Sequence, residues 1–198
     1  IFYNLWSFFG ATSFFYLMKT RIAINGFGRI GRNLFRLLIN HPTIEVVAIN
    51  DLADNKTMAH LLKYDSIHGK LSEEISFDEN HLIINNKKIV FFHEKEISNL
   101  NWKDLNIDFV IESTGKHKTT ELLQNHINNG AKKVILSVSP EDNLIKTIVL
   151  GVNDSILDGT ELIVSNATCT TNNAASMIKI IKELCGLDKA FITTVHSY

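Results

Sequence analysis

A cysteine and a histidine near the end of the 198-residue chain are the side chains best suited to covalent chemistry. Cys169 follows an apolar, strand-like run and opens an amphipathic stretch that predicts a helix. A helix N-terminus carries partial positive charge and favours the thiolate, the nucleophilic form of cysteine. His196 ends the next apolar run, and a helix and the following strand commonly run antiparallel. The pair is therefore a candidate thiol nucleophile and histidine base; a buried, unreactive cysteine and a histidine without a chemical role are the alternative.

The other cysteine and the other histidines are interpreted as having no chemical role. Cys185 ends the same predicted helix beside Leu184, which favours inert packing. Two cysteines without a CxxC pair or a zinc-like histidine spacing argue against a disulfide framework and a structural metal site, and favour a reducing, cytoplasmic compartment. The remaining histidines fall in predicted loops or on polar helix faces, where solvation is expected: His41, His60, His68, His81, His93, His117 and His126.

A glycine-rich turn predicts a dinucleotide site. Gly26, Gly28 and Gly31 form GxGxxG between a predicted strand and a predicted helix. There the first glycine permits a tight turn, the second admits a pyrophosphate, and the third lets helix and strand pack closely. Asp51 ends the next strand, about 20 residues on, where a carboxylate binds the ribose of NAD and repels the 2′-phosphate of NADP. NAD is the predicted cofactor; a methyltransferase and a purely structural turn are the alternatives.

The hydrophobic pattern predicts a sheet that would position these residues. Short apolar runs alternate with amphipathic stretches, as in βαβ units on a parallel sheet. The predicted strands are 21–25, 44–50, 108–113, 132–137, 147–151, 161–165 and 190–196. The predicted helices are 29–40, 57–62, 119–128 and 169–185, the last with an apolar face and Gly186 at its end. Residues 81–92 predict an inserted hairpin that turns at Asn85-Asn86, so the fold class is α/β.

Composition limits the class of protein. With 45% hydrophobic residues the chain can form one domain and part of a second, and a net charge of −1 without basic blocks argues against nucleic-acid binding. Residues 1–17 are uncharged and rich in aromatic residues, with basic residues only after them, unlike a signal peptide. We interpret them as a non-native segment upstream of a start at Met18. A short membrane anchor is the alternative, although polar residues interrupt the segment.

Several sequence blocks together resemble phosphorylating glyceraldehyde-3-phosphate dehydrogenase. They are INGFGRIGRN (24–33), AINDL (48–52), HLLKYDSIHGK (60–70), ESTG (112–115), GAKKVILS (130–137), GVN (151–153), SNATCTTN (165–172) and TTVHS (193–197). They follow the family order, and SNxxCTTN is far more specific than GxGxxG. The resemblance implies a Rossmann-type NAD-binding domain with a largely parallel sheet over 18–168, and the start of an α+β catalytic domain over 169–198.

The resemblance also implies roles for individual residues. Cys169 would be the catalytic nucleophile and His196 its base, with substrate and inorganic phosphate held at Thr168, Cys169 and Thr170. Arg29 and Ile30 would lie against the pyrophosphate, and Lys95 would approach the adenine. The complete set of expected cofactor-binding residues is Asn25, Gly26, Phe27, Gly28, Arg29, Ile30, Gly31, Asp51, Lys95, Thr114, Gly115 and Ser137.

The implied reaction is the NAD-dependent, phosphorylating oxidation of glyceraldehyde 3-phosphate to 1,3-bisphosphoglycerate in glycolysis, by a cytoplasmic homotetramer without membrane or nucleic-acid partners. Erythrose-4-phosphate dehydrogenase shares these motifs and is one alternative; an inactive NAD-binding fragment is another. Aspartate-semialdehyde dehydrogenases lack this pair of cysteine and histidine motifs. The family's catalytic domain continues beyond Tyr198, so the fragment itself is expected to lack turnover. At Asn173–Ser176 the chain departs from the family, which commonly has a second cysteine there.

Overall fold

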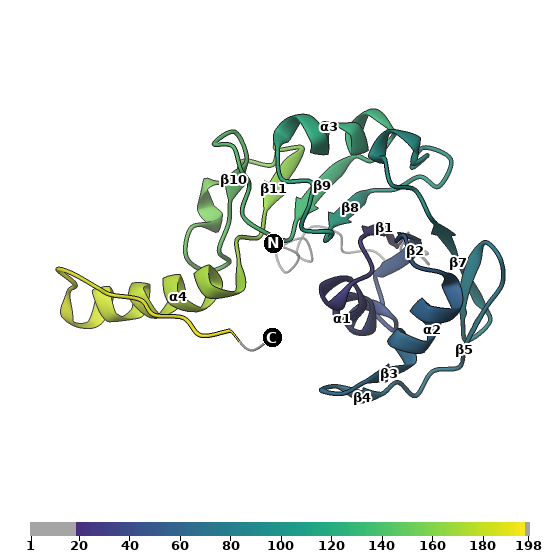
Figure 1. The fold of residues 1–198 in the computed structure, drawn as a ribbon. Coiled ribbons are helices and arrows are strands. Elements are labelled where there is room, and N and C mark those ends of the chain that lie inside the picture. Colours follow the sequence, from purple (N-terminus) through teal and green to yellow (C-terminus); the bar gives the residue numbers. More distant parts are fainter. Residues whose placement is uncertain (1–18, 197–198) are drawn as a thin grey trace, which may run out of the picture.

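A nine-stranded sheet dominates the part of the chain that the computed structural model describes, residues 19–196 (Figure 1). Its strand order is β10-β11-β9-β8-β1-β2-β7-β6-β5. β1 (Thr20–Asn25) lies near the middle and pairs in parallel with β2 (Ile44–Asn50) and with β8 (Phe109–Glu112). Every pair from β10 to β7 is parallel, and only β6 and β5 run antiparallel to their neighbours. The segment 1–17 lies outside the described residues.

Most of the remaining elements follow the predicted alternation, but three short strands, over 64–65, 69–70 and 75–77, were not predicted. The other strands of the sheet are β5 (Ile75–Phe77), β6 (His81–Ile84), β7 (Lys87–Phe92), β9 (Lys133–Leu136), β10 (Lys146–Thr147) and β11 (Ile163–Ser165). A separate small ribbon consists of β3 (Tyr64–Asp65) and β4 (Gly69–Lys70). The helices are α1 (Arg29–Leu38), α2 (Asn55–Lys63), α3 (Thr120–Asn128) and α4 (Cys169–Cys185), with short 3-10 turns at η1 (Ile97–Asn99) and η2 (Asp154–Ile156).

The sheet buries a separate hydrophobic cluster on each face. Successive side chains of a strand point to opposite faces, so Ile22 and Ile24 of β1 join one cluster and Ala23 joins the other. The first cluster includes Phe35 of α1, and the second includes Leu123 of α3. Helices therefore cover both faces of a largely parallel sheet, which confirms the predicted α/β class (Figure 1).

The inserted hairpin is confirmed. β6 and β7 pair antiparallel, and the two residues between them, Asn85 and Asn86, have φ angles of 48° and 66°. Two consecutive residues with positive φ are what a type I′ turn requires, and asparagine tolerates that conformation. Because β7 also pairs in parallel with β2, the hairpin extends the sheet at one edge.

The predicted strand 147–151 is wrong beyond its first residue. β10 covers only Lys146–Thr147, and the chain then turns. The side chain of Asn153 causes this: its Oδ1 accepts from the N–H of Val149 (2.7 Å), and its Nδ2 donates to the carbonyl of Thr147 (3.0 Å). These backbone groups are thus unavailable to a neighbouring strand.

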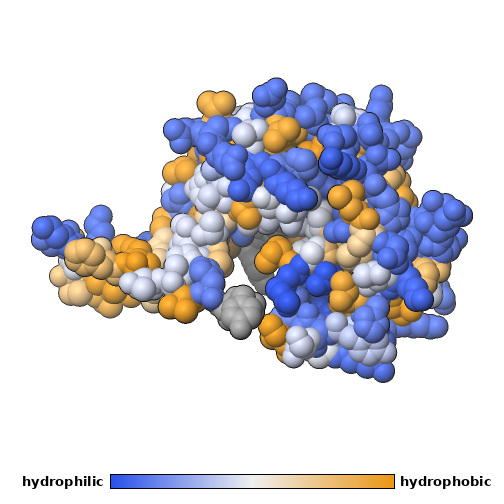
Figure 2. Space-filling model, in the orientation of Figure 1, coloured by the Kyte–Doolittle hydropathy of each residue, from blue (hydrophilic) through white to orange (hydrophobic). Residues whose placement is uncertain are grey.

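The last predicted strand, 190–196, is also wrong. These residues are extended and exposed, and within 19–196 no strand lies beside them to form a ladder. They run back along α4, which projects from the sheet (Figure 1). Four apolar side chains of α4 are exposed, namely Met177, Ile180, Ile181 and Leu184, so its predicted apolar face exists but is not buried. Figure 2 shows hydrophobic residues along this projection.

Candidate functional site: a dinucleotide turn and an exposed thiol

In the turn between β1 and α1, Gly26 and Gly31 lie close to neighbouring backbone, whereas Gly28 faces open space. Gly26 has a φ of +93°, and a Cβ built there would lie 2.6 Å from the backbone nitrogen of Thr114, so the end of β8 touches the turn. A Cβ on Gly31 would collide with the carbonyl oxygen of Gly26. A Cβ on Gly28 would meet no atom within 4 Å. The first and third glycines therefore permit close packing, and the second faces open space.

The start of α1 fits the pyrophosphate of a dinucleotide. Gly28 is the N-cap, no side chain caps the helix, and its first turn has no acidic residue. The first N–H groups of a helix have no acceptor within the helix and carry partial positive charge. Together with the open side of Gly28, they form a cradle for an anion. Arg29 and Ile30 are exposed at this point, Arg29 with its guanidinium 3.9 Å from the carboxylate of Asp65.

Asp51 lies beside this turn at the end of β2. Its Oδ2 accepts a hydrogen bond from the backbone N–H of Phe27 (2.7 Å), and its Oδ1 accepts one from Ala53 (3.0 Å). A carboxylate offers about four acceptor positions, so Asp51 retains capacity for ribose hydroxyls. The structure thus brings the predicted ribose ligand against the predicted phosphate turn.

The other expected cofactor residues follow neighbouring strands at the same edge of the sheet. Thr114 and Gly115 come after β8, Ser137 after β9, and the exposed Lys95 after β7. In an open α/β sheet the carboxyl ends of the parallel strands form the ligand-binding edge. The structure therefore gathers residues that are far apart in sequence along one edge.

Two of the expected cofactor residues have buried side chains. The ring of Phe27 is fully buried and packs edge-on against Phe35 and Phe91, with ring centroids 5.7 and 6.3 Å apart. Asn25 is 1% exposed; its side-chain amide nitrogen donates a hydrogen bond to Glu112, and its amide oxygen accepts one from Asn50. The side chains of these two residues are therefore inaccessible to a cofactor.

The prediction that His126 is solvated is wrong, because its side chain is completely buried. α3 packs on the sheet through Leu123 and His126, which lie on one face of the helix. The indole N–H of Trp102 donates to Nδ1 of His126 (2.9 Å), and Nε2 of His126 lies 3.2 Å from Oε2 of Glu112. The only sequence signal for the burial of His126 was its spacing from the apolar Leu123, which places both residues on one face of the helix.

Glu112 is a buried carboxyl group that sequence reasoning missed, although it opens the ESTG block. Burial by itself raises the pKa of Glu112, but the hydrogen bonds donated by His126, Thr114 and Asn25 outweigh that effect and lower the pKa below its ordinary value. Glu112 is thus a buried carboxylate anion at the carboxyl end of β8, next to the glycine turn.

α4 begins at Cys169, as the sequence predicts. Thr168 is the N-cap, and its Oγ1 accepts from the N–H of Thr171 (3.1 Å), so this hydroxyl already stabilises the helix start. The thiol of Cys169 is exposed. One cavity is lined by Cys169, Thr170 and His196, together with Asn173 and apolar residues of α4 and with residues 190–194. The predicted nucleophile and base therefore share a cavity, even though His196 does not end a strand.

Ala167 introduces backbone strain immediately before this helix, and sequence reasoning missed it. It has a φ of 57°, in the left-handed region that costs a non-glycine residue ~1 kcal/mol, and it is 1% exposed. Its N–H donates to the hydroxyl of Ser165 (3.1 Å) at the end of β11. The strained residue makes the sharp corner that places Cys169 at the sheet edge.

Cys185 stands at the opposite end of α4 and is exposed, so the expectation that it packs inertly is wrong. Its thiol lies 3.3 Å from the carbonyl oxygen of Ile181, one turn earlier. The apolar neighbours that the sequence predicted for it are exposed as well, because nothing among residues 19–196 covers this end of the helix.

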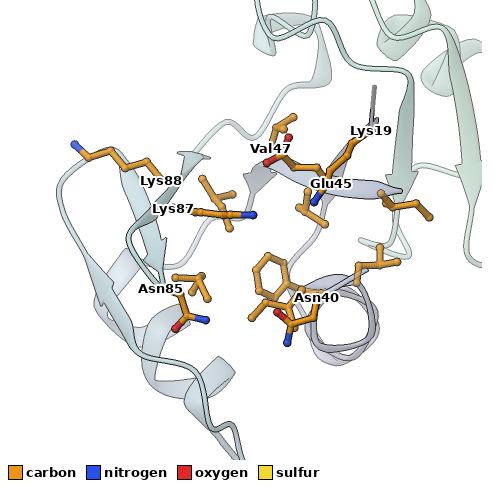
Figure 3. A pocket seen from close by; sticks show the side chains of 14 residues that line it. Lys19, Asn40, Glu45, Val47, Asn85, Lys87 and Lys88 are labelled. Carbon is orange, nitrogen blue, oxygen red and sulfur yellow. The ribbon is translucent and has the colours of Figure 1, made fainter. Parts of the chain in front are cut away.

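A separate cavity lies between α1, β2 and the β6–β7 hairpin (Figure 3). The residues that line it include Lys19, Asn40, Glu45, Lys87 and Lys88, which are labelled in Figure 3, and several apolar residues. It contains none of the residues predicted to act in binding or catalysis. Between residues 19 and 196, no three histidine, cysteine or acidic side chains are grouped to hold a metal ion, and no helix has the length and hydropathy to cross a membrane.

Comparison with known proteins shows the family to which the chain belongs. The model of the family described as "Glyceraldehyde 3-phosphate dehydrogenase, NAD binding domain" matches residues 20–120. Glyceraldehyde-3-phosphate dehydrogenase of Geobacillus stearothermophilus is 48% identical over 182 residues, which are 91% of this chain and 54% of that protein. The enzyme of Thermotoga maritima is 49% identical over 180 residues (90% and 54%), and that of Clostridium pasteurianum 47% over 179 (90% and 53%).

The chain spans about half the length of the curated relatives it matches. The family match runs from β1 into α3 and includes the glycine turn and Asp51. It confirms the Rossmann-type fold and NAD as the cofactor. With its glycine turn, its parallel sheet and this match, the chain belongs to the glyceraldehyde-3-phosphate dehydrogenase family, of which it carries the NAD-binding domain.

Proposed function

We propose that this chain supplies the NAD site and the nucleophile of an enzyme that oxidises glyceraldehyde 3-phosphate to 1,3-bisphosphoglycerate in glycolysis. The single observation that carries the proposal is the cavity shared by Cys169 and His196 at the start of α4. The substrate comes from the name of the relatives. We further propose that the NAD-binding domain ends at Thr168 and that α4, which projects from the sheet, begins the catalytic domain (Figure 1).

The residues of the cavity suit a two-step reaction through sulfur. The Cys169 thiol passes its proton to His196, and its sulfur adds to the aldehyde carbon. The oxyanion that forms takes this proton back as the hydroxyl of a thiohemiacetal, and His196 accepts it again when the adduct is oxidised. NAD held by the glycine turn and Asp51 would supply the hydride acceptor for the oxidation of this adduct to a thioester. Inorganic phosphate then attacks the thioester carbon, the carbon–sulfur bond breaks, and Cys169 leaves as a thiolate beside the acyl phosphate. Sulfur suits both steps because it is a strong nucleophile and a good leaving group.

The start of α4 can stabilise the two negatively charged species of this reaction, the thiolate and the oxyanion. Of its first backbone N–H groups, that of Thr171 donates to Thr168 Oγ1, and those of Cys169 and Thr170 have no acceptor within the helix. They favour a thiolate before the reaction and can stabilise the oxyanion that forms when sulfur adds to the aldehyde. Thr168 and Thr170 flank the thiol and are the proposed contacts to substrate and inorganic phosphate.

The resemblance also supports partners and an assembly that we propose for the whole protein. The partners are a sugar phosphate and inorganic phosphate, and the assembly is a homotetramer in the cytoplasm. A contact across the exposed apolar residues of α4 would be compatible with association, since such surfaces commonly mark interfaces.

Erythrose 4-phosphate is the alternative substrate, and an inactive NAD-binding fragment is the alternative function. The test measures NADH formation by a full-length protein that carries this chain, with each sugar phosphate, in the presence and absence of inorganic phosphate. We expect phosphate-dependent NADH formation with glyceraldehyde 3-phosphate in preference to erythrose 4-phosphate. NAD binding without NADH formation from either sugar would support the inactive module instead.

Gly28→Ala is expected to weaken NAD binding by about 10-fold or more, because its methyl group would occupy the open side of the phosphate cradle. The free energy of unfolding should change by no more than about 1 kcal/mol, since Gly28 has ordinary backbone angles and a Cβ there meets no atom within 4 Å. Titration calorimetry with NAD and urea unfolding measure the two quantities. Unchanged affinity would contradict a pyrophosphate at this turn.

Asp51→Asn is expected to raise the ratio of NADP affinity to NAD affinity by about 10-fold, because it removes the charge that repels a 2′-phosphate. Asparagine keeps an oxygen that can accept from the N–H of Phe27, so the turn should stay folded. Calorimetric titration of both cofactors into the native chain and the variant gives the ratio. Asp54→Asn is a suitable control, since Asp54 caps α2 away from the glycine turn. An unchanged ratio in Asp51→Asn would remove this residue from the ribose site.

A further inference from the structure

A chain of buried hydrogen bonds crosses the sheet beneath the cofactor edge. Trp102 Nε1 donates to His126 Nδ1 (2.9 Å), and His126 Nε2 lies 3.2 Å from Oε2 of Glu112. Asn25 Nδ2 donates to the same oxygen of Glu112 (2.5 Å), and Asn50 Nδ2 donates to Oδ1 of Asn25 (2.7 Å). None of the five residues is more than 5% exposed. The chain therefore joins α3, β8, β1 and β2 out of contact with solvent.

The tautomer of His126 follows from its two partners. An indole N–H is only a donor, so Nδ1 of His126 must accept from Trp102 and carries no proton. The ring proton is then on Nε2 and is donated to Glu112, which makes the contact a hydrogen bond from a neutral imidazole. Glu112 also accepts from Asn25 and from the N–H (2.8 Å) and hydroxyl (2.5 Å) of Thr114.

These four donors match the roughly four acceptor positions of a carboxylate. A buried polar network with every member satisfied is rigid and specifies one arrangement, whereas loss of one member leaves its neighbours unpaired. At the far end, Asn50 continues the network to the backbone of Glu94, donating to its carbonyl (2.9 Å) and accepting from its N–H (2.8 Å). The loop after β7 is thereby tied to the same network.

The network meets the cofactor edge at the ends of β1, β2 and β8 and in the loop after β7, but not at β9, which precedes Ser137. Four members of the network precede an expected cofactor residue by one or two positions: Asn25 precedes Gly26, Asn50 precedes Asp51, Glu94 precedes Lys95, and Glu112 precedes Thr114. The backbone position of each cofactor residue thus depends on a buried hydrogen bond directly before it.

We propose that His126 and Glu112 are positioning residues that set the spacing between the cofactor-binding strand ends. They act through Asn25, Asn50 and Thr114 and do not touch the cofactor themselves. The inference rests on the NAD site proposed above. It distinguishes ligands by their reach: NAD extends from Asp51 across the turn at Gly28 to Thr114 after β8, whereas AMP, with one ribose and one phosphate, reaches only Asp51 and the turn. A change in spacing therefore weakens NAD binding more than AMP binding.

The test compares three variants of this chain. His126→Phe keeps a buried ring and removes both the acceptor for Trp102 and the donor to Glu112. His126→Gln keeps one amide acceptor and one amide donor. Leu123→Ala is the matched control, because Leu123 is equally buried on the same face of α3 and truncation opens a cavity without touching the network.

NAD and AMP are titrated into each variant by calorimetry, at a temperature where urea unfolding shows the variant to be folded. His126→Phe is expected to bind NAD about 10-fold more weakly and AMP within about 2-fold of the native chain. His126→Gln should recover NAD affinity to within about 3-fold, and Leu123→Ala should bind both ligands like the native chain. Nitrogen-15 NMR should show the proton of His126 on Nε2.

Equal losses of NAD and AMP affinity in His126→Phe, or native NAD affinity in that variant, would overturn the proposal, as would a proton on Nδ1. Should His126→Phe not fold, Trp102→Phe replaces it, since only the indole N–H is lost from the network; NAD binding about 3-fold weaker with AMP unchanged is then expected, and native NAD binding overturns the proposal. If the native chain itself fails to bind NAD, the proposed cofactor site falls first. The two failures are therefore distinguishable.

Discussion

Cys169→Ser is expected to lower NADH formation from glyceraldehyde 3-phosphate by at least about 10³-fold in a full-length protein that carries this chain. A serine hydroxyl in the same place is protonated and weakly nucleophilic, and an alkoxide is a poor leaving group in the second step. NAD affinity should be unchanged, because Cys169 begins α4 and lies outside the glycine turn. NADH absorbance and calorimetry measure the two properties. Retained turnover would remove Cys169 from the mechanism.

The same thiol can be tested in this chain without any substrate. Cys169 and Cys185 are both exposed and occupy opposite ends of the 17-residue helix α4. Partial positive charge at the helix start lies beside Cys169 and partial negative charge at the helix end lies beside Cys185, so iodoacetamide should alkylate Cys169 about 10-fold faster than Cys185. Cys169→Ser and Cys185→Ser report each rate separately by mass spectrometry. Equal rates would show that the helix start does not activate the thiol.

Gly26→Ala is expected to lower the free energy of unfolding by about 3 kcal/mol or more. The alanine would combine an unfavourable φ of +93° with a Cβ only 2.6 Å from backbone nitrogen of Thr114, and neither strand end can move without disturbing the sheet. Urea unfolding of the native chain and the variant measures the loss.

Gly115→Ala is the matched control for this substitution. Gly115 also has a positive φ, +70°, but a Cβ there meets no atom within 4 Å, so only backbone strain of about 1 kcal/mol is expected. The difference between the two variants isolates the close approach of β8 to the turn. Equal losses would show that backbone conformation alone accounts for the glycine at position 26.

Local patterns were enough to predict most of the fold. Apart from 147–151 and 190–196, the predicted helices and strands agree with the structure to within two residues at each end. The hairpin turn followed from the tolerance of Asn85 and Asn86 for positive φ, and the glycine turn from the demands of a strand, a helix and an anion at one point. These features depend on residues close together in the sequence, so a single sequence contains the necessary signal.

The failures share a dependence on neighbours that are distant in sequence. The run 147–151 has strand-like composition, but the side chain of Asn153 takes its backbone hydrogen bonds. Residues 190–196 have strand-like composition too, yet a strand exists only where another strand supplies its ladder. Propensity describes a segment alone, whereas strand formation depends on what lies beside it.

The sequence by itself determined the α/β class, the glycine turn with Asp51, and the cysteine at a helix start, because each is a pattern of residue types at short spacing. Only the tertiary structure decided that Cys169 and His196 line one cavity and that His126 is buried against Glu112 and Trp102. In a sequence pattern, a histidine within a predicted helix counts only as a polar residue. Whether it is solvated or part of a buried network depends on which side chains of the sheet and of the adjoining loop meet that face of the helix.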